Sequence, residues 1–547
     1  MSRGAPFTGL GRHFADWAAR QSTGEPELAA RMAGLAIEAL QAGHVCLEAD
    51  AAGLDAERLF ATGLVGHAGE CAAPFVLDAA GRLYLFRYWD HEAALARRLA
   101  VLDRAAPVAN ADAIGTAVGR LFGPLAGDAR DRQREVAMAL ASRGLVVVSG
   151  GPGTGKTWTV ANALAVLAEC WPGDLPPRIG LAAPTGRAAA RLDESLNTAW
   201  PDAARAPRAA RARPAGAQTL HRLLGMRRDG RASFDPCRPL PLDVVVVDEA
   251  SMLDLALARR LAEALADDAR LILLGDRDQL ASVEAGAVLA EICAAAGRGG
   301  PLYGAMIELT HRFRFGAESP ISALADAVRA GAADAALASL GSGNPALTLV
   351  PAEQTGALLG TYAQELAQAI GRGSPGEVAR LLDRERLIAV VREGPWGVTR
   401  IGAEVARLTA TRGGHGEPLL VRANDPAQGL FNGDLGIRWH AGPESGPPKV
   451  WFDGERWFAA ERIPAHEPGY VLTVHRSQGA EFDGVTLILP GSEVLLATRE
   501  LVYTAVTRAR SRVRIVGSRE RLAAAVARRF ERRSGLASRI AAARGQT

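Results

Sequence analysis

Lysine is almost absent from this chain of 547 residues. Of its 63 basic residues only Lys156 and Lys449 are lysines, which leaves 61 arginines (63 − 2). Arginine is therefore the default cation of the chain. A position that keeps lysine is expected to need a compact ammonium on a flexible stem, which the planar guanidinium does not supply. The two lysines are therefore candidates for specific roles.

The chain also lacks an excess of either charge, long apolar runs and closely spaced cysteines. Its net charge is only +3, so attraction to a polyanion would have to come from local clusters. Its five cysteines never form a C-x-x-C pair, which argues against a disulfide framework and against a zinc or cluster site. The N-terminal segment has no apolar core for export, and no uncharged apolar run is long enough to cross a bilayer. We expect a soluble protein of the reducing cytoplasm.

Lys156 lies in LVVVSGGPGTGKTWTVANALAVLAE, where an apolar run meets a glycine-rich turn and then a helical pattern. Gly150, Gly155, Lys156 and Thr157 match G-x-x-x-x-G-K-[ST]. The loop residues between them are Gly151, Pro152, Gly153 and Thr154. In such a loop the backbone N–H groups cradle phosphates, the lysine reaches the β and γ phosphates and the threonine binds Mg²⁺. An incidental glycine turn is the alternative, but strand, spacing and helix together favour a nucleotide site.

Two acidic residues end another apolar run. Runs at 178–184, 242–251 and 270–276 alternate with helical patterns, which is typical of a parallel sheet covered on both faces. Asp248 and Glu249 stand at the end of the second run. An Asp there can hold the Mg²⁺ that bridges the phosphates, and the adjacent Glu can orient and deprotonate the attacking water. A solvated strand end is the alternative, and the upstream phosphate loop favours catalysis.

Two glutamines give weaker signals. Gln279, in GDRDQL, follows the next strand at the same edge of the expected sheet, where its amide can sense the γ phosphate. Gln133, in DRQREVAMAL, begins the helix before the phosphate loop. A glutamine side chain can pair with the N6 and N7 edge of adenine, which would explain a preference for ATP. One such glutamine alone is close to noise.

The second half of the chain repeats the α/β pattern without a second phosphate loop. Apolar runs at 386–393, 484–490 and 512–517 are expected to be buried strands. This half is therefore expected to face the first and to lend residues to its nucleotide. Between these strands, residues 413–470 are rich in glycine, proline, aromatic residues and short alternating runs. We expect a small β-rich insert there, in the form of a barrel.

Arginines without a nearby acid occur late in the chain, in VYTAVTRAR. Arg508 lies 352 residues beyond Lys156 (508 − 156), on what we expect to be a helix just before the last strand. A guanidinium there suits the γ phosphate across an interdomain cleft, as an arginine finger supplied by the same chain. Arg314 in THRFRFGAESP is a second candidate, with Arg312 beside it as the alternative.

Eight segments follow the order found in superfamily 1 DNA helicases: GGPGTGKT, APTGRAAARL, TLHRLLG, VVVVDEAS, GDRDQL, FRFG, TVHRSQGAEF and YTAVTRAR. In detail the chain resembles the RecD family, the alpha subunits of exodeoxyribonuclease V (RecBCD complex). That likeness rests on GHVCLEAD (43–50), LYLFRYW (83–89), VREGPWGV (391–398) and ANDPAQGLFNGDLGI (423–437). It therefore spans nearly the whole chain.

The resemblance implies an α/β protein with two RecA-like P-loop motor domains. The expected domains are an N-terminal partner-docking domain (1–108), motor domain 1 (109–325, with a short hairpin at 222–240), motor domain 2 (326–412 and 471–547) and the β-barrel insert (413–470). The family implies an ATP- and Mg²⁺-dependent motor that moves 5′ to 3′ on single-stranded DNA at a duplex end. It also implies two partners, a RecB-like helicase–nuclease and a RecC-like scaffold.

The resemblance also carries roles onto matching positions. The expected DNA-facing residues are Thr185, Gly186, Arg187, Thr219 and His221 in the first motor domain and Thr473, His475, Ser477 and Gln478 in the second. Gly479 and Glu481 match the part of the later motif that approaches the nucleotide.

Three rival functions remain open at this point. A nuclease would need acids paired with a lysine, and no suitable acidic pair is spaced with Lys449. A structural subunit without motor activity would be expected to lose the phosphate loop and Arg508 first. A stand-alone RecD-like helicase would be expected to carry helix-hairpin-helix repeats at its N-terminus, and none is found in the 149 residues before Gly150.

Overall fold

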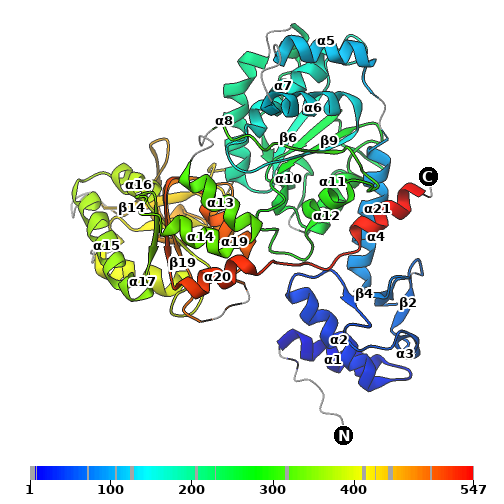
Figure 1. Ribbon diagram of the computed structural model, residues 1–547, viewed down its shortest axis with the longest axis horizontal. Coiled ribbons are helices and arrows are strands. Elements are labelled where there is room, and N and C mark those ends of the chain that lie inside the picture. Colours follow the sequence, from blue (N-terminus) through cyan, green and yellow to red (C-terminus); the bar gives the residue numbers. More distant parts are fainter. Residues whose placement is uncertain are drawn as a thin grey trace.

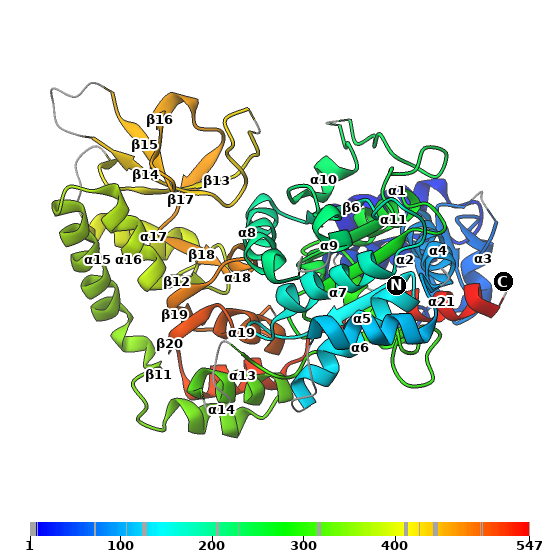
Figure 2. The same cartoon turned by 90° about the horizontal axis from the view of Figure 1, so that it is seen from above.

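The computed structural model describes most of the chain: residue 7 and residues 9–70, 73–104, 107–122, 128–203, 207–227, 229–313, 319–409, 414–425, 427–440, 447–492, 494 and 496–545. Figure 1 and Figure 2 show two large α/β bodies side by side, a small sheet above one of them and an N-terminal module beside the other. Within the described ranges, no helix has both the length and the apolar character that a bilayer crossing requires.

The first motor domain is built on a parallel six-stranded sheet with the order β10-β5-β9-β8-β6-β7. Its strands are β5 (Leu145–Ser149), β6 (Ile179–Ala183), β7 (Gln218–Thr219), β8 (Val244–Val247), β9 (Arg270–Gly275) and β10 (Met306–Glu308). Alternate residues serve opposite faces: Val146 and Val148 join one core, and Leu145 and Val147 join the other. Both faces are buried, which explains why the apolar runs in the sequence are continuous.

Helices cover both faces of this sheet. On one side lie α5 (Ala111–Phe122), α6 (Asp128–Ser142), α7 (Lys156–Cys170), α8 (Gly186–Ala203) and α9 (Pro207–Arg211), and on the other α10 (Leu220–Leu223), α11 (Leu255–Glu263) and α12 (Val288–Ala295). At 222–240, where a hairpin was expected, the described residues form the end of α10 and a loop with one isolated bridge between Asp235 and Arg238. A turn at Asp229–Gly230 does form, closed by a hydrogen bond from Arg227 N to Arg231 O, but the flanking described residues form no strand ladder.

The second motor domain has a parallel five-stranded sheet with the order β11-β20-β19-β12-β18. Its strands are β11 (Leu347–Val350), β12 (Arg386–Ala389), β18 (Val471–Thr473), β19 (Phe482–Ile488) and β20 (Ala509–Val516). One face packs on α13 (Pro320–Ala330), α14 (Ala333–Leu340), α19 (Arg499–Val506) and α20 (Arg519–Ala527), and the other on α15 (Thr355–Gly371), α16 (Pro375–Arg384) and α17 (Val398–Thr409). Three of these strands were expected from the apolar runs.

The insert is an open antiparallel sheet and not the expected barrel. Its order is β16-β15-β14-β13-β17, with β16 and β17 at the two edges of the described sheet. The strands are β13 (Pro418–Val421), β14 (Leu435–Trp439), β15 (Lys449–Phe452), β16 (Arg456–Ala459) and β17 (His466–Pro468). Trp439 and Trp451 belong to the same core as buried residues of α15, α16 and α17, so the second motor domain covers one face of the sheet. The sheet therefore need not close on itself to bury its aromatic residues.

The N-terminal module surrounds a core of its own. It contains α1 (Gly9–Gln21), α2 (Pro26–Gln41), α3 (Ala56–Ala61) and a four-stranded sheet, β1 (Leu47–Glu48), β2 (Val65–His67), β3 (Phe75–Leu77) and β4 (Arg82–Leu85). Helix α4 (Phe86–Leu102) then leaves the module and packs on α11 of the first motor domain. Helix α4 therefore joins the N-terminal module to the first motor domain.

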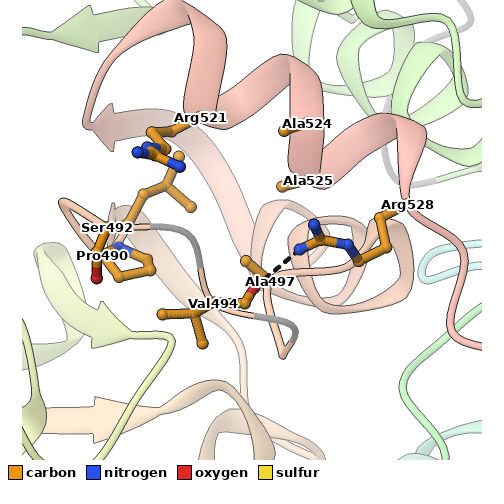
Figure 3. A pocket seen from close by; sticks show the side chains of 9 residues that line it. Pro490, Ser492, Val494, Ala497, Arg521, Ala524, Ala525 and Arg528 are labelled. Carbon is orange, nitrogen blue, oxygen red and sulfur yellow. Dashed lines mark hydrogen bonds between the residues drawn. The ribbon is translucent and has the colours of Figure 1, made fainter.

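The end of the chain corrects the boundary expected at 471–547. Arg528, at the end of α20, donates a hydrogen bond to Val494 O across a small crevice (2.9 Å, Figure 3). The chain then leaves the second motor domain, and α21 (Leu536–Gly545) packs against α4 at the far side of the molecule (Figure 1). We call residues 529–545 the C-terminal strap.

A buried charge on α4 explains where the strap binds. The carboxylate of Glu92 on α4 is fully buried, and a buried carboxylate is costly unless it is paired and hydrogen-bonded. The strap supplies these partners: Arg539 at 3.2 Å, the Ser534 hydroxyl at 2.6 Å and the Gly535 amide at 3.1 Å. On the way, the guanidinium of Arg532 donates to three backbone carbonyls of residues 282–286 in the first motor domain. The strap therefore connects the second motor domain with the first motor domain and with helix α4, which leads out of the N-terminal module.

Candidate nucleotide and DNA site

The glycine-rich loop between β5 and α7 has the shape that a phosphate cradle needs. Gly153 and Gly155 each have φ of +77°, a left-handed conformation that side chains disfavour. At Gly150 the reason is space, because a Cβ there would lie 2.9 Å from the carbonyl oxygen of Leu309. Helix α7 begins at Lys156, directly after this loop, so its free N–H groups and its positive dipole end face the loop.

Lys156 is held inside the loop. Its ammonium donates hydrogen bonds to the carbonyl oxygens of Gly150 and Gly151, the second at 3.0 Å. Carbonyl oxygens are weaker partners for an ammonium than phosphate oxygens are. The residue is therefore positioned to exchange these bonds for phosphate contacts. Thr154, also in the loop, donates its hydroxyl hydrogen to the Gly151 carbonyl and stiffens the turn.

Asp248 and Glu249 follow β8 and face the same loop. Burial and the neighbouring Glu249 raise the pKa of Asp248 to about 6, against an ordinary value of 3.8, and Lys156 opposes that shift. Glu249 has φ of +51°, unusual for a residue with a side chain, and its amide donates to Asp248 Oδ1 at 2.8 Å. A partly buried carboxylate of this kind gains from a divalent cation beside it, so Asp248 and Thr157 fit a Mg²⁺ held by few protein ligands.

Substitution of Asp248 by asparagine should stabilise the protein while removing Mg²⁺-dependent hydrolysis. The folded-state pKa lies above the unfolded value, so ionised Asp248 costs stability, and this cost grows as pH rises from about 4 to about 6. Above that window Asp248→Asn should raise the unfolding free energy by about 1–3 kcal/mol. Thermal unfolding at pH about 5 and pH about 8 measures the difference. Equal melting temperatures at the higher pH would contradict the expectation.

One cleft of about 630 Å³ joins residues from both motor domains. From the first it is lined by the phosphate loop, Asp248, Glu249 and Gln279, and from the second by Gly479, Glu481, Arg508 and Arg510. Arg508 is buried and donates to the carbonyl oxygens of Thr504 at 3.2 Å and Ala480 at 3.3 Å. It follows the last turn of α19 and does not lie on the helix, which corrects the sequence expectation. The structure thus brings Lys156 and Arg508 to opposite walls of one cleft.

The second arginine candidate cannot be placed in the cleft. Arg314 lies outside the described residues. Its neighbour Arg312 forms an ion pair with Asp326 of α13 at 2.6 Å and lines a separate cavity of about 220 Å³ beside the loop. Arg312 is therefore engaged with the second motor domain.

The two glutamines lie near the cleft in different ways. Gln133 on α6 is buried, and its Nε2 lies 3.6 Å from the position that a Cβ on Gly155 would take. Gln279 is also buried and lines the cleft, and its Nε2 donates to Asp276 Oδ2 at 3.3 Å. Gln133 therefore lies beside Gly155 of the phosphate loop, whereas Gln279 faces that loop across the cleft.

Arg191 was not identified from the sequence. It lies on α8 of the first motor domain and reaches across the cleft, donating to Gly479 O at 2.8 Å and pairing with Glu481 at 3.0 Å. Helical spacing was a usable signal, because Arg191 follows Arg187 by four residues and so lies on the same helix face. Arg510 pairs with Glu481 from the other side at 3.4 Å.

Three of the expected DNA-facing residues cap helices. The hydroxyls of Thr185, Thr219 and Thr473 accept from the amides of Ala188, Arg222 and Arg476, at 3.2, 3.3 and 3.3 Å. They precede α8, α10 and α18 (Val474–Ser477). Each cap fixes a helix N-terminus, a position suited to phosphate contacts.

The other expected DNA-facing residues differ in exposure. His221 is exposed, whereas burial and Arg532 lower the pKa of half-buried His475. Ser477 and Gln478 are buried, and Gln478 Nε2 donates to Leu280 O of the first motor domain at 2.7 Å. Arg187 faces the ring of Phe482 at 6.0 Å, and burial lowers its pKa.

Gly186 contacts the insert. A Cβ on Gly186 would lie 2.6 Å from Cβ of Phe431, so the glycine allows a close approach between α8 and the loop before β14. Phe431 belongs to the ANDPAQGLFNGDLGI segment. The insert therefore reaches the first motor domain beside the expected DNA-facing residues.

Comparison with known proteins agrees with the resemblance to RecD-type helicases over nearly the whole chain. Residues 128–344 match the model of an AAA domain, and residues 468–516 match a UvrD-like helicase C-terminal domain. The chain is 40% identical to the RecBCD enzyme subunit RecD of Mycolicibacterium smegmatis, with 94% of each chain covered. It is 34% identical to the ATP-dependent RecD2 DNA helicase of Deinococcus radiodurans, over 75% of this chain and 52% of that one. A solved Pif1 helicase from Bacteroides is 18% identical, with 69% and 90% covered and a TM-score of 0.38.

A parallel α/β domain that carries a phosphate loop, a second parallel α/β domain and a cleft lined by both, together with the family match and the RecD relatives, define a superfamily 1 DNA helicase. Within that class, identity of 40% across almost the full length decides the family. The chain belongs to the RecD family, and it is an ATP-dependent DNA helicase.

Proposed function

We propose that this helicase is the motor of a helicase–nuclease complex and moves 5′ to 3′ on single-stranded DNA at a duplex end. The observation that carries the proposal is the composite cleft, in which Lys156 of one domain and Arg508 of the other line the same cavity. A motor needs nucleotide-dependent closure of two domains, and a site divided between them supplies it.

The residues of the cleft divide the work. Lys156 and the loop amides bind the β and γ phosphates, and Arg508 exchanges its carbonyl partners for the γ phosphate when the domains close. Thr157 and Asp248 would hold Mg²⁺, which neutralises charge on the phosphates. Glu249 takes the proton of the attacking water, and Gln279 orients that water. Release of phosphate frees Arg508, and the domains part.

The grip on DNA is proposed to alternate between the domains. Thr185, Arg187, Thr219 and His221 act in the first domain, and the motif from Thr473 to Gln478 acts in the second. Contacts of helix N-termini and side chains with phosphates would make the grip tolerant of sequence and sensitive to salt. Net charge near zero agrees with a local and not a global attraction.

The direction of movement is tested with tailed duplexes. With ATP and Mg²⁺, the protein should unwind a duplex carrying a 5′ single-stranded tail and leave a duplex with only a 3′ tail paired. Displacement of a fluorescent strand measures both substrates, and a blunt duplex is the control. Preference for the 3′ tail would contradict the proposed polarity while leaving the ATP site intact.

Partners of two kinds are proposed, a RecB-like helicase–nuclease subunit and a RecC-like scaffold. Support comes from relatives that are themselves named as RecBCD subunits. The N-terminal module, with its own core, is the proposed docking element. The stand-alone alternative is disfavoured because the chain is 40% identical to the M. smegmatis RecD chain but 34% identical to the D. radiodurans RecD2 chain.

The expected result is that the chain co-purifies with both partners when the three are produced together. Removal of residues 1–85 should abolish co-purification while the phosphate loop still binds ATP. Recovery of a stable complex without the module would assign docking to another surface.

A further inference from the structure

Tyr503 has no role in the mechanism above, yet it makes a buried contact between the motor domains. It lies on α19 of the second domain and is 1% exposed. Its hydroxyl donates to Asp276 Oδ2 of the first domain at 2.9 Å. Burial and the adjacent Asp276 raise the pKa of Tyr503 far above its ordinary value, so the hydroxyl stays protonated and remains a donor.

The same carboxylate oxygen also holds Gln279. Asp276 Oδ2 accepts from Gln279 Nε2 at 3.3 Å, while its Oδ1 accepts from the amide of Asp278 at 3.0 Å. Gln279 Oε1 is buried, and no donor among the described residues reaches it. The amide nitrogen is therefore fixed by Asp276, while the amide oxygen, at the wall of the cleft, keeps an acceptor that a donor there could use. A water placed to attack the γ phosphate is such a donor.

The tyrosine hydroxyl also touches the phosphate loop. A Cβ on Gly151 would lie 3.0 Å from the Tyr503 oxygen and 3.7 Å from Asp276 Oδ2. Gly151 has an ordinary negative φ, so space and not backbone conformation accounts for glycine here. One hydroxyl from the second domain thus meets the phosphate loop and the residue that orients Gln279.

We propose that Tyr503 is a positioning residue that links the orientation of Gln279, through Asp276, to closure of the two motor domains. The inference rests on the proposed ATP site. Arg508 follows Tyr503 by five residues (508 − 503), directly after the same helix, so a shift of α19 that moves one moves the other. Closure then delivers the arginine to the phosphate and aligns the water-orienting amide in a single step.

Two other hydrogen bonds between the motor domains lie nearby, and they bind backbone atoms instead of a side chain of the cleft. Thr504 Oγ1 accepts from Leu280 N at 2.9 Å, and Gln478 Nε2 donates to Leu280 O at 2.7 Å. Both hold the backbone at Leu280 and leave the side chains in the cleft untouched. The Tyr503 bond is thus separable from simple docking of the domains.

The test is Tyr503→Phe, which keeps the ring and removes the donor. The turnover number of DNA-stimulated ATP hydrolysis should fall by about 10-fold to 100-fold, as expected for a lost hydrogen bond to a charged group, while KM for ATP changes by less than about 2-fold. Tyr362→Phe is the matched control, because Tyr362 is equally buried in the same domain and its hydroxyl has no partner among the described residues. It should hydrolyse ATP like the parent.

A second variant separates positioning from stability. Asp276→Asn should lower turnover alone, and the double variant with Tyr503→Phe should be little worse than either single one, because both act through one bond. Additive losses, a raised KM with unchanged turnover, or parent-like turnover of Tyr503→Phe would each overturn the inference. Hydrolysis by Lys156→Gln would instead show that the proposed ATP site is wrong. An inactive Lys156→Gln beside a fully active Tyr503→Phe would refute only the role of Tyr503.

Discussion

Replacement of Lys156 by glutamine is expected to abolish ATP hydrolysis with and without single-stranded DNA. The ammonium is the only lysine cation of the cleft, and the carbonyls of Gly150 and Gly151 already hold it in the loop. Glutamine keeps a polar side chain that is one bond shorter, but it brings no charge to the phosphates. Loss of about 10³-fold in turnover is expected, because electrostatic stabilisation of the transferred phosphoryl group dominates such reactions.

The chain supplies its own control for this experiment. Lys449, the other lysine, is exposed at the start of β15 in the insert. Lys449→Gln removes the same charge far from the cleft and should hydrolyse ATP at the parent rate. Phosphate release measures both variants, and binding of labelled single-stranded DNA checks that Lys156→Gln remains folded. Retained hydrolysis in Lys156→Gln would refute the site assignment.

Replacement of Arg508 should lower the turnover of ATP hydrolysis about as much as replacement of Lys156, but without loss of nucleotide binding. An arginine that reaches the γ phosphate in the transition state contributes about 10³-fold to 10⁵-fold to turnover. Arg508→Ala should therefore reduce turnover by that order while ATP still binds, because the loop that holds the nucleotide belongs to the other domain. Arg508→Lys should recover little, since an ammonium cannot reproduce the paired contacts of a guanidinium.

Arg508 is buried, so its removal tests folding as well as catalysis. Arg519→Ala, at an exposed position on α20 of the same domain, is the matched control. Melting temperatures and the affinity for a fluorescent ATP analogue should be compared with turnover for all three variants. A loss of turnover that follows only a loss of nucleotide binding would argue against an arginine finger.

Features that depend on neighbours in sequence were predictable. The phosphate loop, the strands before and after it, and the acids at the end of β8 each follow from a few consecutive residues, whose pattern already fixes the local backbone. The shared cleft with Arg508 was also expected, because the second half of the chain has no phosphate loop of its own and the arginines of VYTAVTRAR have no nearby acid in the sequence. The nine family-derived DNA-facing residues stay predictions, since no contact with DNA tests them.

Features that depend on pairing across space were not predictable. Helical spacing places Arg191 on the same face as Arg187, and Tyr503 has ordinary helical surroundings, but nothing in the sequence identifies Glu481 or Asp276 as their partners. The strap was assigned to the wrong domain because its apolar positions indicate burial but not which core they join. The insert was expected to close because its alternation of residues could not show that helices of the second motor domain cover one face.

The strap has a mechanical consequence. Because Arg532 fastens to the backbone at 282–286 and Arg539 to Glu92, the second motor domain is tied to the rest of the molecule at its trailing end. A domain anchored at both ends of its polypeptide can rotate in fewer directions relative to the rest of the molecule than a domain held at one end. Successive cycles of ATP hydrolysis would then repeat the same closing movement, which a motor that advances stepwise along a DNA strand requires.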